Sequence, residues 1–180
     1  MVPDAAFNKD VIHLYGRHKF LIAEKTREGE TKMAKGKAFL LVGHAHWGKS
    51  KTLTALTDGN WNVRYITIKG VEFKIKRSSN SDNLEPCLEF VKNVTYPNLI
   101  IAFSSDGPEE RQILEILKRK YDLYFFVLQH KYNNPDSEIS EAENKLLEAY
   151  SNSIESYTPK HEPAEKRATA FRAYIKSKLP

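Results

Sequence analysis

Cysteine is nearly missing from this sequence, since Cys87 is the only one among 180 residues. An intrachain disulfide is therefore excluded, and a reducing compartment, the cytoplasm, is the expected location. Cys87 falls in a segment whose pattern is typical of a helix. We interpret it as a small core residue rather than a nucleophile.

Long apolar runs are also missing. No run approaches the roughly 20 residues that a membrane-spanning helix needs, and residues 1–4 lack the basic and apolar segments of a signal peptide. The sequence contains no internal repeat, no low-complexity tract and no cluster of metal-ligating residues. These absences predict a soluble protein with no membrane span and exclude a repeat architecture.

The composition describes one domain of mild positive charge. Hydrophobic residues make up 41% and charged residues 28% of a 20.7 kDa chain, which is long enough for one buried core and too short for two. Lysine and arginine number 28 against 23 aspartates and glutamates, which gives a net charge of +5. This balance suits a protein that handles phosphates and leaves a polyanionic partner open.

One stretch combines an apolar strand with a glycine-rich loop. The run at residues 38–42 has the length of a buried strand and ends at Gly43. Gly48-Lys49-Ser50 follows, and residues 52–56 are able to begin a helix. The order strand, G-x-x-x-x-G-K-[ST], helix resembles the phosphate-binding loop of the P-loop NTPase superfamily. The other residues of the predicted binding loop are His44, Ala45, His46, Trp47 and Lys51.

The resemblance implies a nucleoside triphosphate and Mg²⁺ as ligands. Gly43 and Gly48 permit backbone angles that a side chain would forbid, so that the N–H groups of residues 46–51 form an anion-binding nest. The helix that begins near Lys49 adds the positive end of its dipole. Lys49 is expected to reach the β- and γ-phosphates, and the Ser50 hydroxyl is expected to ligate Mg²⁺.

The remaining periodicities predict an α/β fold, a three-layer sandwich like that of the P-loop NTPases. Alternating runs on either side of Lys69-Gly70 are typical of a β-hairpin. Apolar runs at 98–103 and 122–128 are typical of buried parallel strands. We therefore expect a mostly parallel sheet with an antiparallel hairpin after the first helix, and the nucleotide at the carboxyl ends of the strands. The other predicted helices are 84–94, 109–121, 138–151 and 164–179.

The chain divides into three parts by composition. Residues 1–36 are interpreted as a basic N-terminal extension packed on the core, and residues 37–153 as the nucleotide-binding domain. Residues 154–180 are expected to hold a linker, rich in Ser and Pro from residue 151 onward, and a basic C-terminal helix. That helix either docks on the core, which we favour, or contacts a partner or nucleic acid.

Two aspartates are candidate Mg²⁺ ligands. P-loop enzymes need a carboxylate at the end of a strand near the loop. Asp106 follows the strand at 98–103, but Ser104 occupies the position directly after that strand. Asp82 is the carboxylate of the loop after the hairpin. Each has an alternative role as the cap or turn residue ahead of a helix. The candidate catalytic residues are Lys49 and Asp106.

The end of the strand at 122–128 contains the candidate base site. GTPases place Asn-Lys-x-Asp here, and this sequence has Lys131 at the lysine position. Asn133 stands where a carboxylate would accept both donors of guanine, so the sequence favours ATP over GTP. Lys131 or Tyr132 is expected to pack on the base.

Three functions of different classes are consistent with these patterns. The one we favour is a Mg²⁺-dependent NTPase, a hydrolase that cleaves ATP slowly and acts with a protein partner. The second is a P-loop kinase that transfers the γ-phosphate to a small molecule or a polynucleotide. The third is a non-catalytic module that binds nucleic acid or protein through the basic segments at both ends of the chain.

Overall fold

The structure, a computed structural model, describes residues 23–25, 31–33, 35–132 and 134–180. By its internal contacts the chain divides into two units, Met1–Ala34 and Lys35–Pro180. The described part of the first unit is an antiparallel pair of short strands, β1 (Ala23–Lys25) and β2 (Thr31–Met33). The predicted N-terminal extension, residues 1–36, lies largely outside the described residues.

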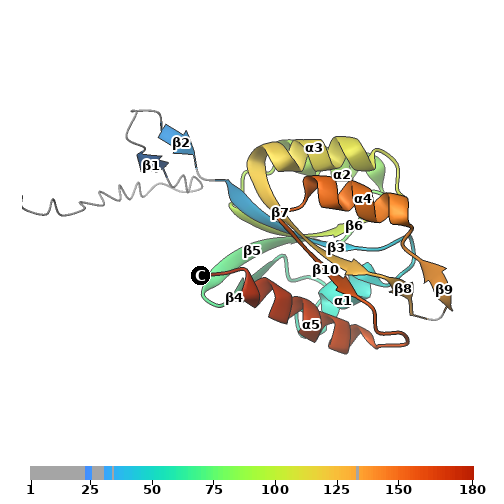
Figure 1. Cartoon of the computed structure of the whole chain (residues 1–180). Helices are drawn as coiled ribbons and strands as arrows, with labels where there is room; N and C mark the ends of the chain where they lie inside the picture. The colour runs from blue at the N-terminus through green and yellow to red at the C-terminus, as the bar shows by residue number, and fades with distance from the viewer. Residues whose placement is uncertain (1–22, 26–30, 34, 133) are drawn as a thin grey trace, which may run out of the picture. The chain divides into compact units, whose positions relative to one another are not determined.

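The second unit contains a six-stranded sheet. Its strands are β3 (Gly36–Val42), β4 (Tyr65–Ile68), β5 (Val71–Lys76), β6 (Asn98–Phe103), β7 (Tyr121–Leu128) and β10 (Ser153–Tyr157). Their order across the sheet is β10-β7-β3-β6-β5-β4 (Figure 1), and all neighbours are parallel except β4 and β5. The prediction of a mostly parallel α/β sheet with an antiparallel hairpin after the first helix is confirmed.

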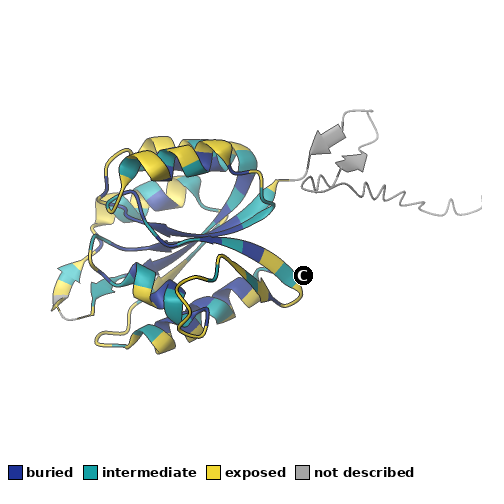
Figure 2. Ribbon diagram, turned by 180° about the vertical axis from the view of Figure 1, so that it is seen from behind, coloured by how far each residue is buried: buried dark blue, intermediate teal, exposed yellow. Residues whose placement is uncertain are grey.

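Helices cover both faces of this sheet. They are α1 (Lys49–Ala55), α2 (Leu84–Asn93), α3 (Glu110–Lys120), α4 (Glu141–Tyr150) and α5 (Ala164–Ser177). Figure 1 shows α2, α3 and α4 on one face and α1 and α5 on the other. The central strands are buried from both sides (Figure 2), and every residue from Ala38 to Val42 is fully buried. Apolar strands therefore form the middle of three layers.

The register of the central strands brings three loops to one edge of the sheet. Val42 of β3 lies opposite Phe103 of β6 and Val127 of β7. The Gly43 N–H donates to the Phe103 carbonyl at 3.2 Å, which continues the pairing for one more residue. Because parallel strands in this register end together, the residues that follow β3, β6 and β7 emerge side by side.

Local sequence signals account for where several elements begin. Lys69 and Gly70 are both left-handed, with φ of 51° and 76°, and form the predicted turn between β4 and β5. Ser140 and Glu143 form a capping box, in which each side chain accepts a hydrogen bond from the other residue's N–H. This box sets the start of α4 at Glu141, which is later than the predicted start at residue 138.

The predicted linker is wrong over Ser153–Tyr157, which form β10. Among the described strands, β10 pairs with β7 alone and lies at the edge of the sheet. An edge strand is less buried by its neighbours than a central strand, so its residues need not form a continuous apolar run. The sequence therefore gives only a weak indication of such a strand. A second unpredicted element is the small antiparallel pair of β8 (His130–Lys131) and β9 (Asn134–Glu138).

The C-terminal helix α5 docks on the core, as we favoured from the sequence. Phe171 is fully buried, and its ring centroid lies 5.2 Å from that of Phe126 in β7. Cys87 is buried within α2, as predicted, and burial raises the pKa of its thiol. No helix in the described part of the chain is both long enough and apolar enough to cross a membrane.

We predict that α5 is required for the stability of this unit. Phe171→Ala should lower the free energy of unfolding by about 3–5 kcal/mol, because it leaves a cavity among aromatic rings. Urea denaturation at neutral pH measures the change. Lys176→Ala, on the exposed side of the same helix, should change it by less than about 0.5 kcal/mol. Equal effects of the two substitutions would show that α5 does not pack as described.

Candidate functional site

The loop that joins β3 to α1, here called the β3–α1 loop (residues 43–48), contains the predicted phosphate-binding motif. It begins at the carboxyl edge of the sheet, beside the end of β6. The Thr52 N–H donates to the Gly48 carbonyl at 2.9 Å, so the first helical hydrogen bond of α1 closes directly on the loop. The predicted order of strand, glycine-rich loop and helix is present.

The backbone of the β3–α1 loop alternates in handedness. His46 has φ of 62° and Gly48 has φ of 83°, while Trp47 between them is not left-handed. Residues of positive φ that alternate with residues of negative φ are typical of loops whose successive N–H groups turn toward a common side, as in an anion nest. Gly48 meets the predicted need for a glycine, because a side chain there would be strained.

Gly43 does not have the backbone role that the sequence suggested. It is not among the left-handed residues of the described chain, so its φ does not require glycine. A Cβ built on Gly43 would lie 3.4 Å from the nearest atom of Trp47, which is ordinary contact. The second left-handed position of the loop falls instead on His46, which has a side chain and is exposed.

Most N–H groups of the loop and of the first turn of α1 have no acceptor among the described residues. The exception at the tip is Trp47, whose N–H donates to the His44 carbonyl at 3.3 Å. Within the part of the chain that the structure describes, no acceptor is found for the N–H groups of His44, Ala45, His46, Gly48, Lys49, Ser50 and Lys51. Backbone donors without partners are what an anion requires.

Lys49 lies beneath the loop with its ammonium enclosed. The side chain is 5% exposed and donates to the carbonyls of Gly43 at 2.7 Å and His44 at 2.6 Å, and to Ser104 Oγ at 3.1 Å. These bonds use all three ammonium protons. Burial lowers the pKa of Lys49 to about 8, against the opposing charges of Asp82 and Asp106. The ammonium is thus held at the loop but incompletely neutralised.

Both predicted metal carboxylates lie within electrostatic range of Lys49. Asp106 follows β6 and is exposed, and its Oδ1 lies 3.1 Å from Ser104 Oγ. Asp82 accepts hydrogen bonds from the N–H and the hydroxyl of Ser79, at 2.8 and 2.9 Å, so it also acts as the turn residue of its loop. No group of three or more histidine, cysteine, aspartate or glutamate side chains that could hold a metal occurs among the described residues.

The other predicted residues of the motif differ in their contacts and in their exposure to solvent. The Ser50 hydroxyl, in the first turn of α1, donates a hydrogen bond to the Arg77 carbonyl at 3.0 Å. Lys51 and His46 are exposed, and Ala45 is half-buried. Trp47 is buried, with its ring centroid 4.5 Å from that of His44.

Glu143 is a contact of the loop that the sequence did not indicate. Its Oε1 lies 2.7 Å from His44 Nε2 and accepts the Ser105 hydroxyl at 2.6 Å. Burial alone would raise the pKa of Glu143, but hydrogen bonds from Ser105, Ser140 and His44 lower it to about 2. The charged carboxylate therefore ties α4 to the loop and to the end of β6.

Arg167 of α5 is the second unpredicted contact. It is 6% exposed and its Nη1 donates to the Trp47 carbonyl at 2.8 Å. One signal was available in the sequence, because Arg167 lies on the same helical stripe as Phe171 and Tyr174 and therefore faces the core.

The residues predicted for the base site lie on the β8–β9 hairpin. Lys131 is half-buried in β8, and Tyr132 is 47% exposed with its ring centroid 5.9 Å from the Arg167 guanidinium. Asn133, on which the argument against guanine depends, lies outside the described residues.

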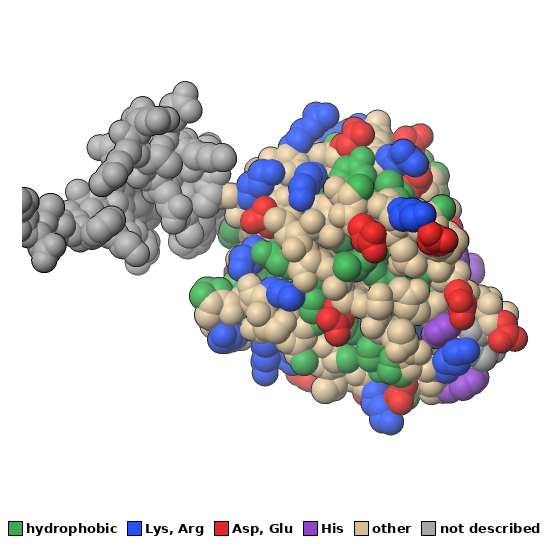
Figure 3. Space-filling view, viewed as in Figure 1, with side chains coloured by type: hydrophobic (Ala, Val, Ile, Leu, Met, Phe, Trp, Pro, Cys, Tyr) green, Lys and Arg blue, Asp and Glu red, His purple; other side chains and the backbone are tan. Residues whose placement is uncertain are grey.

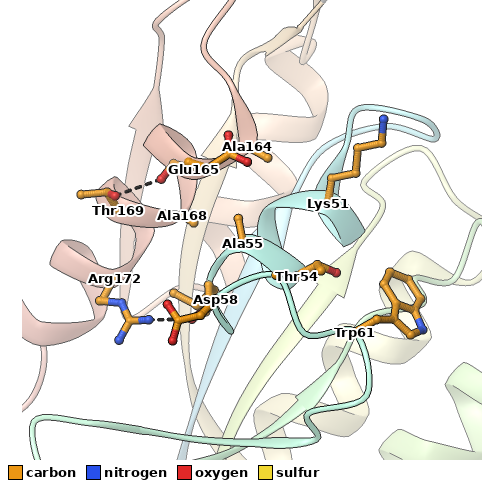
Figure 4. A pocket seen from close by; sticks show the side chains of 12 residues that line it. Lys51, Thr54, Ala55, Asp58, Trp61, Ala164, Glu165, Ala168, Thr169 and Arg172 are labelled. Atoms are coloured by element: carbon orange, nitrogen blue, oxygen red, sulfur yellow. Dashed lines mark hydrogen bonds between the residues drawn. The ribbon is translucent and has the colours of Figure 1, made fainter.

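A cavity of about 740 Å³ lies between α1 and α5 rather than over the β3–α1 loop (Figure 4). Of the predicted site residues, only Lys51 lines it. Arg172 closes one side, where its Nη2 donates to the Leu56 carbonyl at 2.6 Å. No residue of the β3–α1 loop lines this cavity.

We predict that Glu143 stabilises the protein only while it is charged. Because its folded pKa is lower than its usual value of 4.5, its contribution is complete above about pH 4.5 and is lost as the pH falls toward 2. Glu143→Gln should lower the free energy of unfolding by about 2 kcal/mol at pH 7. In urea titrations the difference from wild type should shrink by pH 3. A difference that is constant from pH 7 to pH 3 would contradict this assignment.

Comparison with models of protein families finds no match to this chain, and comparison with curated protein sequences finds none either.

Proposed function

We propose that the β3–α1 loop binds the phosphates of a nucleoside triphosphate together with Mg²⁺. The observation that carries this proposal is the alternating handedness at residues 46–48, directly ahead of a buried lysine ammonium. The left-handed residues supply convergent N–H groups, and Lys49 supplies a positive charge at the same loop. The G-x-x-x-x-G-K-[ST] pattern supports the same ligand, since its resemblance to the P-loop NTPase superfamily assigns these residues to phosphates.

A bound phosphate would replace one of the three contacts of the Lys49 ammonium. The bond to Ser104 Oγ, at 3.1 Å, is longer than the two bonds to carbonyls. The two carbonyls can therefore continue to orient the ammonium while its third proton turns to a phosphate oxygen. A charge held in this way favours an anion strongly, because it lies in a site that is mostly shielded from water.

The oxygen atoms of Ser50, Asp106 and Asp82 support the proposal of a magnesium ion near the loop. A hydroxyl that ligates a metal must direct its proton elsewhere, and the Ser50 hydroxyl gives its proton to the Arg77 carbonyl. Asp106 offers an exposed carboxylate at the end of β6, and Asp82 offers a second one after β5. Mg²⁺ prefers oxygen ligands and keeps several waters, so a hydroxyl and one carboxylate suffice from the protein. When bound, the ion would neutralise phosphate charge.

We further propose slow hydrolysis of ATP, with a protein partner that increases the rate. Lys49 and Asp106 would act on the reacting phosphate and its metal. ATP is favoured over GTP because Asn133 cannot accept the two guanine donors that a carboxylate would accept. Tyr132 presents an exposed ring near the Arg167 guanidinium, which bonds to the loop, and a base can stack on that ring.

Two alternatives lead to different measurements. A kinase would form ADP only when an acceptor is present, whereas an NTPase releases phosphate without one. A nucleic-acid-binding module would bind without nucleotide and with a steep dependence on salt. On the face seen in Figure 3, basic and acidic side chains are interspersed, which gives no continuous basic surface on that side.

We predict that Lys49→Met weakens the binding of Mg·ATP by about 100-fold, because it removes the charge and the donor at the loop. Methionine keeps the length of the buried side chain, so the fold should be retained. Isothermal titration calorimetry with ATP and GTP measures the affinities, and circular dichroism checks the fold. Lys92→Met, on the exposed surface of α2, is the matched control and should bind as wild type does. Unchanged affinity of Lys49→Met would rule out this site.

We also predict that the carboxylate after β6 matters more for turnover than the one after β5. Asp106→Asn should lower Mg²⁺-dependent phosphate release by at least about tenfold, because β6 is the direct neighbour of β3. Asp82→Asn should have a smaller effect, since its carboxylate is engaged by Ser79. A malachite-green assay over a range of Mg²⁺ concentrations compares them. The reverse order would move the metal carboxylate to the loop after β5.

A further inference from the structure

Arg167 is buried beside the β3–α1 loop without a carboxylate partner among the described residues. Its Nη1 donates to the Trp47 carbonyl at 2.8 Å, and its Nη2 would lie 2.8 Å from a Cβ built on Gly48. Its Nε is buried and has no hydrogen-bond partner in the described part of the chain. Burial lowers the pKa of Arg167, with only partial compensation from nearby groups.

This arrangement is unfavourable for folding alone. A buried cation loses its hydration, and a buried donor without an acceptor adds a further penalty. A neutral side chain of the same length would fill the same space without either penalty. The position of Arg167 therefore calls for an explanation other than stability.

The geometry of one peptide group supplies that explanation. The Trp47 carbonyl and the Gly48 N–H belong to the same planar trans peptide, so they point in opposite directions. Arg167 donates to this carbonyl. The Gly48 N–H then points away from Arg167, toward the side on which we propose that the anion binds. The positive charge behind the peptide also polarises it, which makes that N–H a stronger donor.

We propose that Arg167 is a positioning residue that holds the β3–α1 loop in its anion-binding conformation through the Trp47 carbonyl. The inference rests on the proposed function for its ligand, a nucleoside triphosphate or another polyphosphate. Arg167 acts from behind the loop and does not touch the phosphates. Its uncompensated charge is balanced when the polyanion binds on the other side of the same peptide. Gly48 allows this approach, because it lacks the Cβ that would meet the guanidinium.

Trp47 provides a direct reporter of the loop. The chain has two tryptophans, and Trp61 is 58% exposed. In a Trp61→Phe background, the tryptophan fluorescence, excited selectively over that of the nine tyrosines, comes from Trp47 alone, which is 3% exposed. Arg167→Met removes the charge and all donors and keeps the buried stem, so it should fold. Arg172→Met is the matched control, because Arg172 makes the same kind of bond from the same helix to the Leu56 carbonyl at the end of α1.

In the absence of nucleotide, Arg167→Met should shift Trp47 emission to longer wavelength and increase its quenching by acrylamide, whereas Arg172→Met should do neither. Calorimetry with Mg·ATP and with tripolyphosphate should show about tenfold weaker binding to Arg167→Met than to either the background protein or Arg172→Met. Urea denaturation should show that Arg167→Met is at least as stable as the background protein.

The outcomes separate this inference from the proposed function. If the background protein binds Mg·ATP and Arg167→Met binds it equally well, the positioning role is wrong and the nucleotide site stands. An equal loss of affinity in Arg172→Met would also overturn it, since the effect would then belong to α5 as a whole. If the background protein binds no polyphosphate, the proposed function fails. The Trp47 emission spectrum alone then tests whether Arg167 positions the loop. A shift in Arg167→Met would still support its hold on the loop, and an unchanged spectrum would exclude it.

Discussion

The parallel pairing of β3 with both β6 and β7 is the constraint on which the rest of the site depends. Val42 lies opposite Phe103 and Val127, and the apolar strands favour this register because each is buried on both faces. The residues after the three strands must then share one edge of the sheet. This brings Ser104 within reach of Lys49 although 55 positions separate them. A slip of one residue in the pairing of β3 with β6 would turn Ser104 toward the other face of the sheet and away from Lys49.

Several groups of the site weaken the fold rather than strengthen it. Lys49 and Arg167 are both almost fully buried cations, and neither is matched by a carboxylate in direct contact among the described residues. His46 adopts a left-handed backbone that most residues with a side chain avoid. Strain and unbalanced charge of this kind persist only where the surrounding structure enforces them, and they gather at functional sites. Here the surrounding structure is a buried apolar sheet. The free energy gained by burying it offsets the cost of the strain and of the unbalanced charges.

The sequence predicted the central part of the fold and the local motif, because both depend on neighbours along the chain. Continuous apolar runs identified β3, β6 and β7, and Lys69-Gly70 identified the hairpin. The edge strand β10 was not predicted. It pairs on one side, so its residues are partly exposed and do not form a continuous apolar run. The contacts of Glu143 and Arg167 with the loop join residues about 100 positions apart or more. These contacts form only when α4 and α5 pack on opposite faces of the sheet, so no local sequence pattern indicates them.

The shortness of α1 explains why contacts from α5 matter to the loop. A helix of seven residues is marginal on its own and depends on tertiary packing. Helix α5 bonds to the backbone at both ends of α1, through Arg167 at the Trp47 carbonyl and Arg172 at the Leu56 carbonyl. Through the Arg167 bond, the conformation of the β3–α1 loop is coupled to the docking of α5, a segment more than 100 residues away in sequence. A change that displaced α5 would loosen the N–H groups of the loop before it disturbed the sheet, because β3 is held by both of its neighbours.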